Sequence, residues 1–261
     1  MAVRSYQTQR GEPTLKAERL AQQQLLDVQA LDSRLDQLTR RRRTLPQLAE
    51  IADLELCRSE LSDRLVEVRT EVDDLSREQR KADADVEQVK ARRVRNEERL
   101  DKGQVGSPRD LENLQHELEA LHRRISDLED EELAVMERLE EAQSTLVRLE
   151  AALGDLDASR EQRAATRDST FAEIDAEVAE VAAQRRDLAT SLPAELLTLY
   201  DGLRAKNGGV GAAALAHGRC GGCRLEMNAA DLRDIAAAAG DDVVRCEECG
   251  RILVRTAESG V

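Results

Sequence analysis

The chain has 261 residues and a formal net charge of −14, from 39 basic and 53 acidic residues. Aromatic residues make up 1% of the chain and charged residues 35%, a composition typical of long helices rather than of a thick globular core. The negative charge disfavours bulk binding of nucleic acids, and no apolar run approaches the roughly 20 residues that span a bilayer. We therefore expect a cytoplasmic protein that has no membrane partner.

Residues 1–13 are polar and without periodicity, which predicts a disordered lead-in. From residue 14 to residue 191, apolar side chains recur at spacings of three and four, the seam pattern of a coiled coil. Gly103 and Pro108 predict a turn over residues 102–109, because glycine suits the end of a helix and proline its first turn. The predicted fold is mainly α: a long antiparallel coiled-coil hairpin over residues 14–191. Its clearest seam residues are Leu54, Leu61, Leu65, Val68, Leu75, Val86, Leu114, Leu121, Ile125, Leu128, Leu139 and Ala142.

Pro46 interrupts the first arm, because proline cannot donate a hydrogen bond within a helix. In the hairpin this proline faces about residue 164, where the expected seam positions carry arginines. The sequence therefore predicts a bend near residues 46 and 164. Cys57 falls in register between two seam leucines and is predicted as a buried cysteine rather than a reactive thiol.

Residues 192–261 are predicted to hold a connector helix followed by a small metal-binding domain. Cys220 and Cys223 form one CxxC pair, and Cys246 and Cys249 form another. Two such turns place four thiolates around one ion, so we predict a structural Zn²⁺ with four cysteine ligands and no open coordination position. The alternatives are a redox dithiol pair or two disulfides, or His217 as a substitute ligand. We predict no catalytic residue and no other cofactor.

The residues around the cysteine pairs predict a zinc ribbon with a helical insertion. Residues 243–245 and 251–255 have the composition of two strands that flank the second pair. Residues 228–239 are predicted as the inserted helix, with Asn228 as its N-cap and Gly240 at its end.

Three segments carry a resemblance to a known family. They are residues 103–117 at the turn, residues 192–200 at the connector, and the two cysteine pairs with residues 245–253. Together they resemble the bacterial family that joins a coiled coil to a C4-type zinc ribbon, and the arginine-rich composition is similar to that of actinobacterial members. The resemblance implies an adaptor; some relatives are linked to flagellar or type III secretion systems and bind the nitrogen-type sigma factor, and one is linked to a flagellin transcript.

The leading functional prediction is a non-enzymatic adaptor or scaffold that binds a protein partner in transcription regulation or a secretion-type assembly, as a monomer or homodimer. The alternative is a nucleic-acid-binding module, in which RNA or DNA contacts the ribbon or the arginine run at residues 40–43. The ribbon residues in that alternative are Arg224, Arg245, Arg251 and Arg255. An enzyme is the third class, and it is disfavoured because four cysteines leave the metal no open position.

Overall fold

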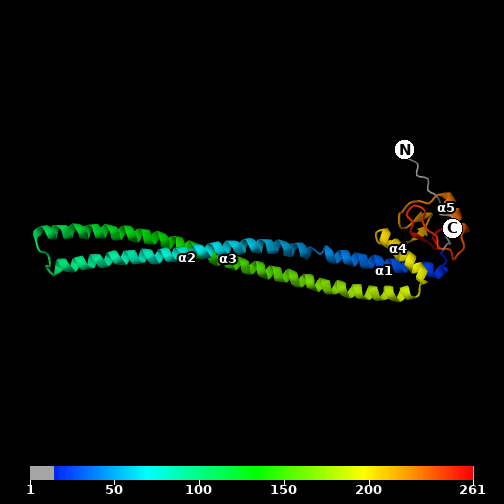
Figure 1. Ribbon diagram of the computed structural model, residues 1–261, viewed down its shortest axis with the longest axis horizontal. Coiled ribbons are helices and arrows are strands. Elements are labelled where there is room, and N and C mark those ends of the chain that lie inside the picture. Colours follow the sequence, from blue (N-terminus) through cyan, green and yellow to red (C-terminus); the bar gives the residue numbers. More distant parts are fainter. Residues whose placement is uncertain (1–14, 261) are drawn as a thin grey trace, which may run out of the picture. The chain divides into compact units, whose positions relative to one another are not determined.

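The computed structural model describes residues 15–260, so the predicted lead-in lies outside the described residues. The fold is mainly α with a small three-stranded sheet, which confirms the predicted class (Figure 1). In chain order the elements are α1 (Arg19–Arg43), α2 (Pro46–Asp101), α3 (Pro108–Thr190), α4 (Ala194–Lys206), β1 (Ala212–Ala216), β2 (Arg219–Cys220), α5 (Ala229–Ala237) and β3 (Ile252–Arg255).

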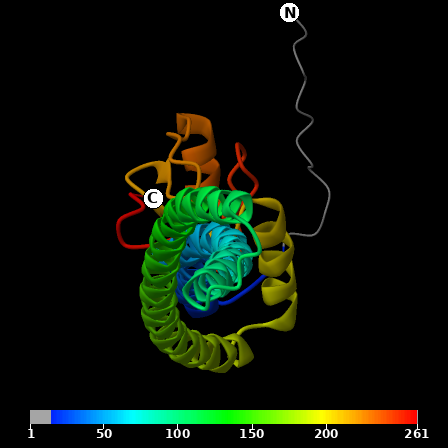
Figure 2. The same ribbon diagram turned by 90° about the vertical axis from the view of Figure 1, so that its left-hand side faces the viewer.

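The chain forms two compact units, residues 47–166 and the remainder. In the first of these, α2 and the N-terminal part of α3 run side by side and coil about each other (Figure 1 and Figure 2). They bury a narrow apolar seam, as the repeat in the sequence predicts. The buried seam residues are Ile51, Leu65, Val68, Leu75, Val86, Leu114, Leu121, Ile125, Leu128, Val135, Leu139 and Ala142.

Ion pairs between α2 and α3 border this seam and confirm the antiparallel direction. Arg69 contacts Glu150 at 2.7 Å, and Lys90 contacts Glu129 at 2.8 Å. As residue numbers rise along α2, the residue numbers of their partners on α3 fall. Exposed pairs of this kind contribute only about 0.2–1 kcal/mol each, so they fix the register more than they stabilise the unit.

The turn between α2 and α3 follows the chemistry of its residues. Gly103 has a φ of 62°, the left-handed conformation that glycine adopts readily. Ser107 caps α3, because its Oγ accepts a hydrogen bond from the Asp110 amide at 3.2 Å. The Ser107 hydroxyl also donates to the Asp110 carboxylate at 2.7 Å, so both side chains are fixed at the start of the helix.

Cys57 is exposed, so its predicted burial is wrong. The reason lies in the surrounding seam: no residue from 52 to 64 on α2 is buried, and none from 143 to 166 on α3. Gly154, Asp157 and Arg160 lie in this stretch of α3, and its leucines, such as Leu153 and Leu156, are only half-buried, so the seam here does not cover the cysteine. The helices here are held instead by ion pairs such as that of Arg58 with Asp157 at 2.7 Å.

Pro46 is the first residue of α2, and α1 ends three residues earlier at Arg43. On the other arm, α3 is unbroken from Pro108 to Thr190 and therefore remains helical through residue 164. The bend near residues 46 and 164 stays a prediction.

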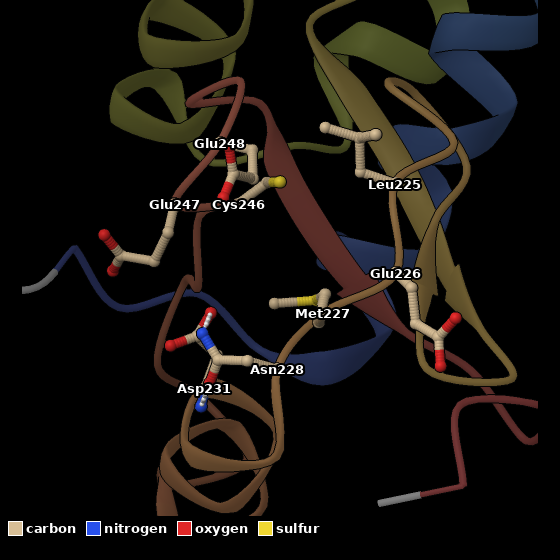
Figure 3. Close-up of a pocket in the computed structure, with 8 residues that line it drawn as sticks. All are labelled: Leu225, Glu226, Met227, Asn228, Asp231, Cys246, Glu247 and Glu248. Atoms are coloured by element: carbon tan, nitrogen blue, oxygen red, sulfur yellow. Dashed lines mark hydrogen bonds between the residues drawn. The ribbon is translucent and has the colours of Figure 1, made fainter. Parts of the chain in front are cut away.

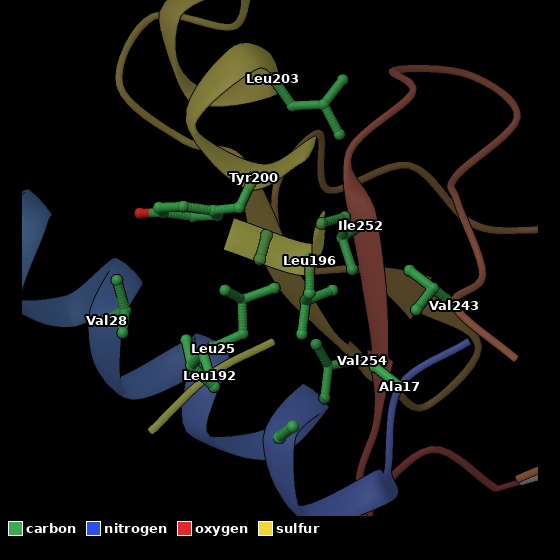
Figure 4. Close-up of a cluster of buried hydrophobic side chains, with 12 residues drawn as sticks. Ala17, Leu25, Val28, Leu192, Leu196, Tyr200, Leu203, Val243, Ile252 and Val254 are labelled. Atoms are coloured by element: carbon green, nitrogen blue, oxygen red, sulfur yellow. The ribbon is translucent and has the colours of Figure 1, made fainter. Parts of the chain in front are cut away.

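In the second unit, α1, α4 and the sheet share one apolar core (Figure 4). Leu25 and Val28 of α1 meet Leu196 and Tyr200 of α4, and Ile252 of β3 packs against them; all five are fully buried. The connector helix α4 therefore packs between the ribbon and α1 in one shared core.

The sheet has the order β2-β1-β3. β1 pairs antiparallel with β2, where Leu215 faces Cys220, and parallel with β3, where Ala212 faces Ile252. The strand predicted over residues 243–245 is wrong: this segment forms one isolated bridge, between Arg245 and Ile252. The inserted helix is present as α5, and Asn228 is its N-cap.

Candidate metal centre

The four predicted cysteines converge at one point of the ribbon. Their Sγ atoms all lie within 4.8 Å of one another, and none of these cysteines forms a disulfide. The sulfurs of Cys220 and Cys249 are 3.9 Å apart, as are those of Cys223 and Cys246. A tetrahedral shell with Zn–S bonds of about 2.3 Å requires sulfurs about 3.8 Å apart, so the group fits a zinc ion.

Both cysteine turns use the same backbone geometry. The amide of Arg224 donates to the Cys220 carbonyl at 2.7 Å, and the amide of Gly250 donates to the Cys246 carbonyl at 2.8 Å. The residue that follows each pair is left-handed, with φ values of 64° at Arg224 and 69° at Gly250. The first turn thus holds an arginine in a conformation that favours glycine.

Strands of the sheet set the positions of the two cysteine turns. Cys220 ends β2 and pairs with β1, while the Cys246 amide donates to the Arg251 carbonyl at 2.9 Å just before β3. The first turn carries two glycines for a steric reason. A Cβ on Gly222 would lie 2.6 Å from Cδ of Arg251, and one on Gly221 would lie 3.1 Å from the Ala214 carbonyl oxygen.

The thiols differ in how readily they ionise. Burial raises the pKa of Cys220, and it raises the pKa of Cys246 to about 12. At Cys249 burial acts in the same direction, but hydrogen bonds from Arg251 and neighbouring thiols outweigh it and lower the pKa to about 7. A divalent cation would compensate the buried charge of the thiolates, so metal binding and thiol ionisation are linked.

His217 does not join the ligand group. It lies in the turn between β1 and β2 with a φ of 50°, and its amide donates to the Glu258 carbonyl at 2.9 Å. The group of ligand atoms in the described residues consists of cysteines only.

Three of the four ribbon arginines weighed as nucleic-acid contacts donate hydrogen bonds to backbone carbonyls. Arg245 binds the Gly250 carbonyl at 2.9 Å, and Arg251 binds those of Val210 and Asn207 at 3.0 and 2.9 Å. Arg255 closes the C-terminal end of α5 by donating to the carbonyls of Ile235, Ala238, Ala239, Gly240 and Asp242. These side chains stabilise the ribbon, and Arg224 is the one of the four whose side chain forms no hydrogen bond or ion pair among the described residues.

A buried polar cluster beside the ribbon was missed by the sequence reasoning. Asp32 is 4% exposed and accepts hydrogen bonds from the Tyr200 hydroxyl at 2.7 Å and from Arg185 at 3.2 Å. Gln29 accepts a hydrogen bond from the Gly211 amide at 2.7 Å, where the chain enters β1. The available signal was Asp32 itself, because it continues the apolar stripe of Leu25 and Val28 on α1 at helical spacing.

The hairpin, the sheet and the four thiols define a helical hairpin protein with a C4-type zinc ribbon. Family models agree: a CT398-like coiled coil hairpin domain matches residues 28–208, and a C4-type zinc ribbon domain matches residues 219–253. The chain belongs to the CT398-like coiled-coil hairpin family, as the resemblance implied. Its ribbon holds one structural zinc ion.

Relatives from mycobacteria cover almost the whole chain and support an actinobacterial membership. An uncharacterized protein, found in two strains of Mycobacterium tuberculosis, is 36% identical over 241 residues, which is 92% of this chain and 98% of the relative. A solved structure from Mycobacterium smegmatis is 33% identical, with a TM-score of 0.80 over 93% of this chain and 100% of that one.

The structure of CT398 from Chlamydia trachomatis has the same fold. It is 19% identical, with a TM-score of 0.65 over 90% of this chain and 98% of that one. Among the described residues, no helix combines the length and the apolar composition needed to span a membrane.

Proposed function

We propose that this protein is a non-enzymatic adaptor that binds a protein partner, and that Cys220, Cys223, Cys246 and Cys249 are its zinc ligands. The observation that carries the proposal is the convergence of four thiols within 4.8 Å. Four thiolates complete a tetrahedral shell, so the ion has no position left for water or substrate, and its role is structural. Both matched families are structural domains as well.

The packing of the ribbon supports an adaptor role. The sheet shares its core with α1 and α4, and Gln29 of α1 binds the backbone amides of Gly211 and Ala212 at 2.7 and 3.3 Å. The ribbon is therefore fixed on these helices and presents its outer surface in a defined orientation relative to them. We place the protein in the cytoplasm, where thiols remain reduced and available to zinc, as a monomer or homodimer.

Crosslinking in the source organism, followed by purification of the full-length chain, tests the proposal. Val105→Asp changes the helical turn, Cys246→Ser removes a zinc ligand, and Cys57→Ser serves as the matched control. We expect a reproducible protein partner with wild type and with Cys57→Ser, and its loss with at least one of the other two variants. Recovery of no partner, or equal recovery with every variant, would contradict the adaptor role.

A further inference from the structure

The ribbon carries a small surface pocket beside the second cysteine pair, which we call the acidic notch (Figure 3). Three segments of the chain meet there: the exit from the first cysteine turn, the start of α5, and the second cysteine turn. The notch is small, with a volume of about 70 Å³. Its lining residues are Leu225, Glu226, Met227, Asn228, Asp231, Cys246, Glu247 and Glu248.

The notch is lined mainly by polar atoms, and the apolar side chains of Leu225 and Met227 lie among its carboxylates. Met227 lies centrally and is 8% exposed, while Leu225 is 51% exposed, although leucine side chains are usually buried (Figure 3). Glu247 and Glu248 form no ion pair or hydrogen bond with the side chains that the structure describes. The rim is therefore left with negative charge that the rest of the chain does not neutralise.

The other two carboxylates of the rim are already held in place. Asp231 accepts a hydrogen bond from the Asn228 side chain at 2.8 Å, and Glu226 pairs with Arg219 at 3.2 Å. Asn228 in turn caps α5, so the floor of the notch is anchored to a helix end. Cys246 adds to the negative charge, because a zinc ion bound by four thiolates is an anionic centre.

The geometry disfavours a metal ion and a nucleic acid as the occupant. Within the described part of the chain, the four ligand cysteines form the one group of three or more ligand residues that converges closely enough to hold an ion, so no three rim carboxylates do so. A phosphate backbone would be repelled by the same carboxylates. Spread-out negative charge beside the exposed side chain of Leu225 matches an extended cation that has an apolar neighbour.

We propose that the acidic notch binds a short segment of another protein that presents an arginine or lysine next to an apolar side chain. The apolar side chain packs on Leu225 and Met227, and the basic group is neutralised by Glu247 and Glu248. The notch is far smaller than the pockets that enclose small-molecule ligands, so the contact there is limited to a side chain of the partner lying against its surface. This inference rests on the proposed adaptor function and assigns the partner's chemistry at one surface.

Selection of displayed ten-residue peptides on the zinc-loaded full-length chain tests the proposal. We expect enrichment of peptides that place a basic residue beside a leucine, isoleucine, valine or phenylalanine. The affinity of the synthetic peptides, measured by fluorescence anisotropy, should fall about three- to tenfold in Glu247→Gln/Glu248→Gln, because two rim charges are lost. Leu225→Ser should weaken binding by a similar factor, and the effect of the double variant should shrink at high salt.

Glu195→Gln/Glu258→Gln is the matched control, since it removes two exposed carboxylates that do not line the notch. Peptides without a basic residue, equal affinity in the notch and control variants, or no enrichment above background would each overturn the proposal. Binding that occurs only after deletion of residues 1–14 would also overturn it, because it would assign the notch to the chain's own N-terminal segment. A partner crosslinked in cells, combined with any of these results, would leave the adaptor function standing and reject the notch alone.

Discussion

At the scale of single residues, the two cysteine turns share a conformation but differ in the residue that bears it. Gly250 and Arg224 both have left-handed φ values, of 69° and 64°. A non-glycine residue loses about 1–2 kcal/mol in this conformation because its Cβ approaches the following carbonyl oxygen. The first turn therefore contains strain that the second one avoids.

Reciprocal substitutions at these two positions should have opposite effects on the ribbon. Arg224→Gly is expected to stabilise it by up to about 1 kcal/mol, and Gly250→Ala to destabilise it by about 1–2 kcal/mol. Hydrogen exchange of ribbon amides in the zinc-loaded chain measures both. Equal effects of the two changes would show that the left-handed conformation is not the source of strain.

The Asp32 cluster makes a second prediction at this scale. Tyr200→Phe keeps the ring in the core but removes the hydroxyl that donates to the buried Asp32 carboxylate at 2.7 Å. A hydrogen bond to a charged group contributes about 1.5–3 kcal/mol, so the unfolding free energy should fall by roughly that amount. Denaturant unfolding measures the change, with Cys57→Ser, at an exposed position of α2, as the control. No difference between the two variants would mean that Arg185 at 3.2 Å and Arg204 at 3.6 Å satisfy Asp32 without the hydroxyl.

At the scale of elements, the helical hairpin depends on a seam whose packing is uneven. Buried residues are regularly spaced on α3 from Leu114 to Ala142, but none occurs from residue 143 to residue 166. The facing part of α2, residues 52–64, lacks buried residues too. Fully buried apolar side chains thus stabilise one stretch of the hairpin, while the leucines of the next are at most half-buried.

Hydrogen exchange along α3 should reveal this difference. Local opening is easier where few apolar contacts form, so amides of residues 147–164 are expected to exchange faster than those of residues 118–142. Mass spectrometry of peptic fragments gives the two rates in one experiment. Uniform protection along both stretches would contradict the role assigned to seam packing.

The elements that could be predicted from the sequence are those with local signals. The helix cap at Asn228, the proline at the start of α2 and the proline at the start of α3 all act on residues within one helical turn. β1 was missed because its sequence is mostly alanine, and its parallel pairing with β3 joins residues about 40 positions apart. The burial of Cys57 was predicted wrongly because the apolar repeat along one helix does not reveal which side chains of the other helix face it.

The metal site, like the fold, could be predicted where its signals are local in the sequence. Two CxxC pairs specify four thiolates whatever lies between them, so the zinc and its ribbon were accessible from spacing alone. The two glycines of the first turn, by contrast, are required because Arg251 and Ala214 lie too close for a larger side chain. These contacts exist only in the folded chain, so the sequence does not reveal them. The arginines looked like a nucleic-acid surface because a sequence shows their charge but not the carbonyls they bind.

At the scale of the whole molecule, the chain joins long helices to a ribbon that contains the four metal ligands. The ribbon has a small core of its own, formed by residues such as Leu215, Ile235 and Leu253 together with Cys220 and Cys246. Two of its core residues are thus thiols of the metal centre. Zinc binding supplies folding free energy of order 10–16 kcal/mol in small domains of this kind, so the ribbon should depend on it.

The most direct test of the account is the zinc content of the purified full-length chain, in wild type, Cys246→Ser and the control Cys57→Ser. We expect one zinc ion per chain in wild type and in Cys57→Ser, and loss of zinc in Cys246→Ser with the helical circular dichroism signal largely retained. The same zinc content in Cys246→Ser as in wild type would contradict the assignment of these four cysteines as the centre that holds the ribbon together.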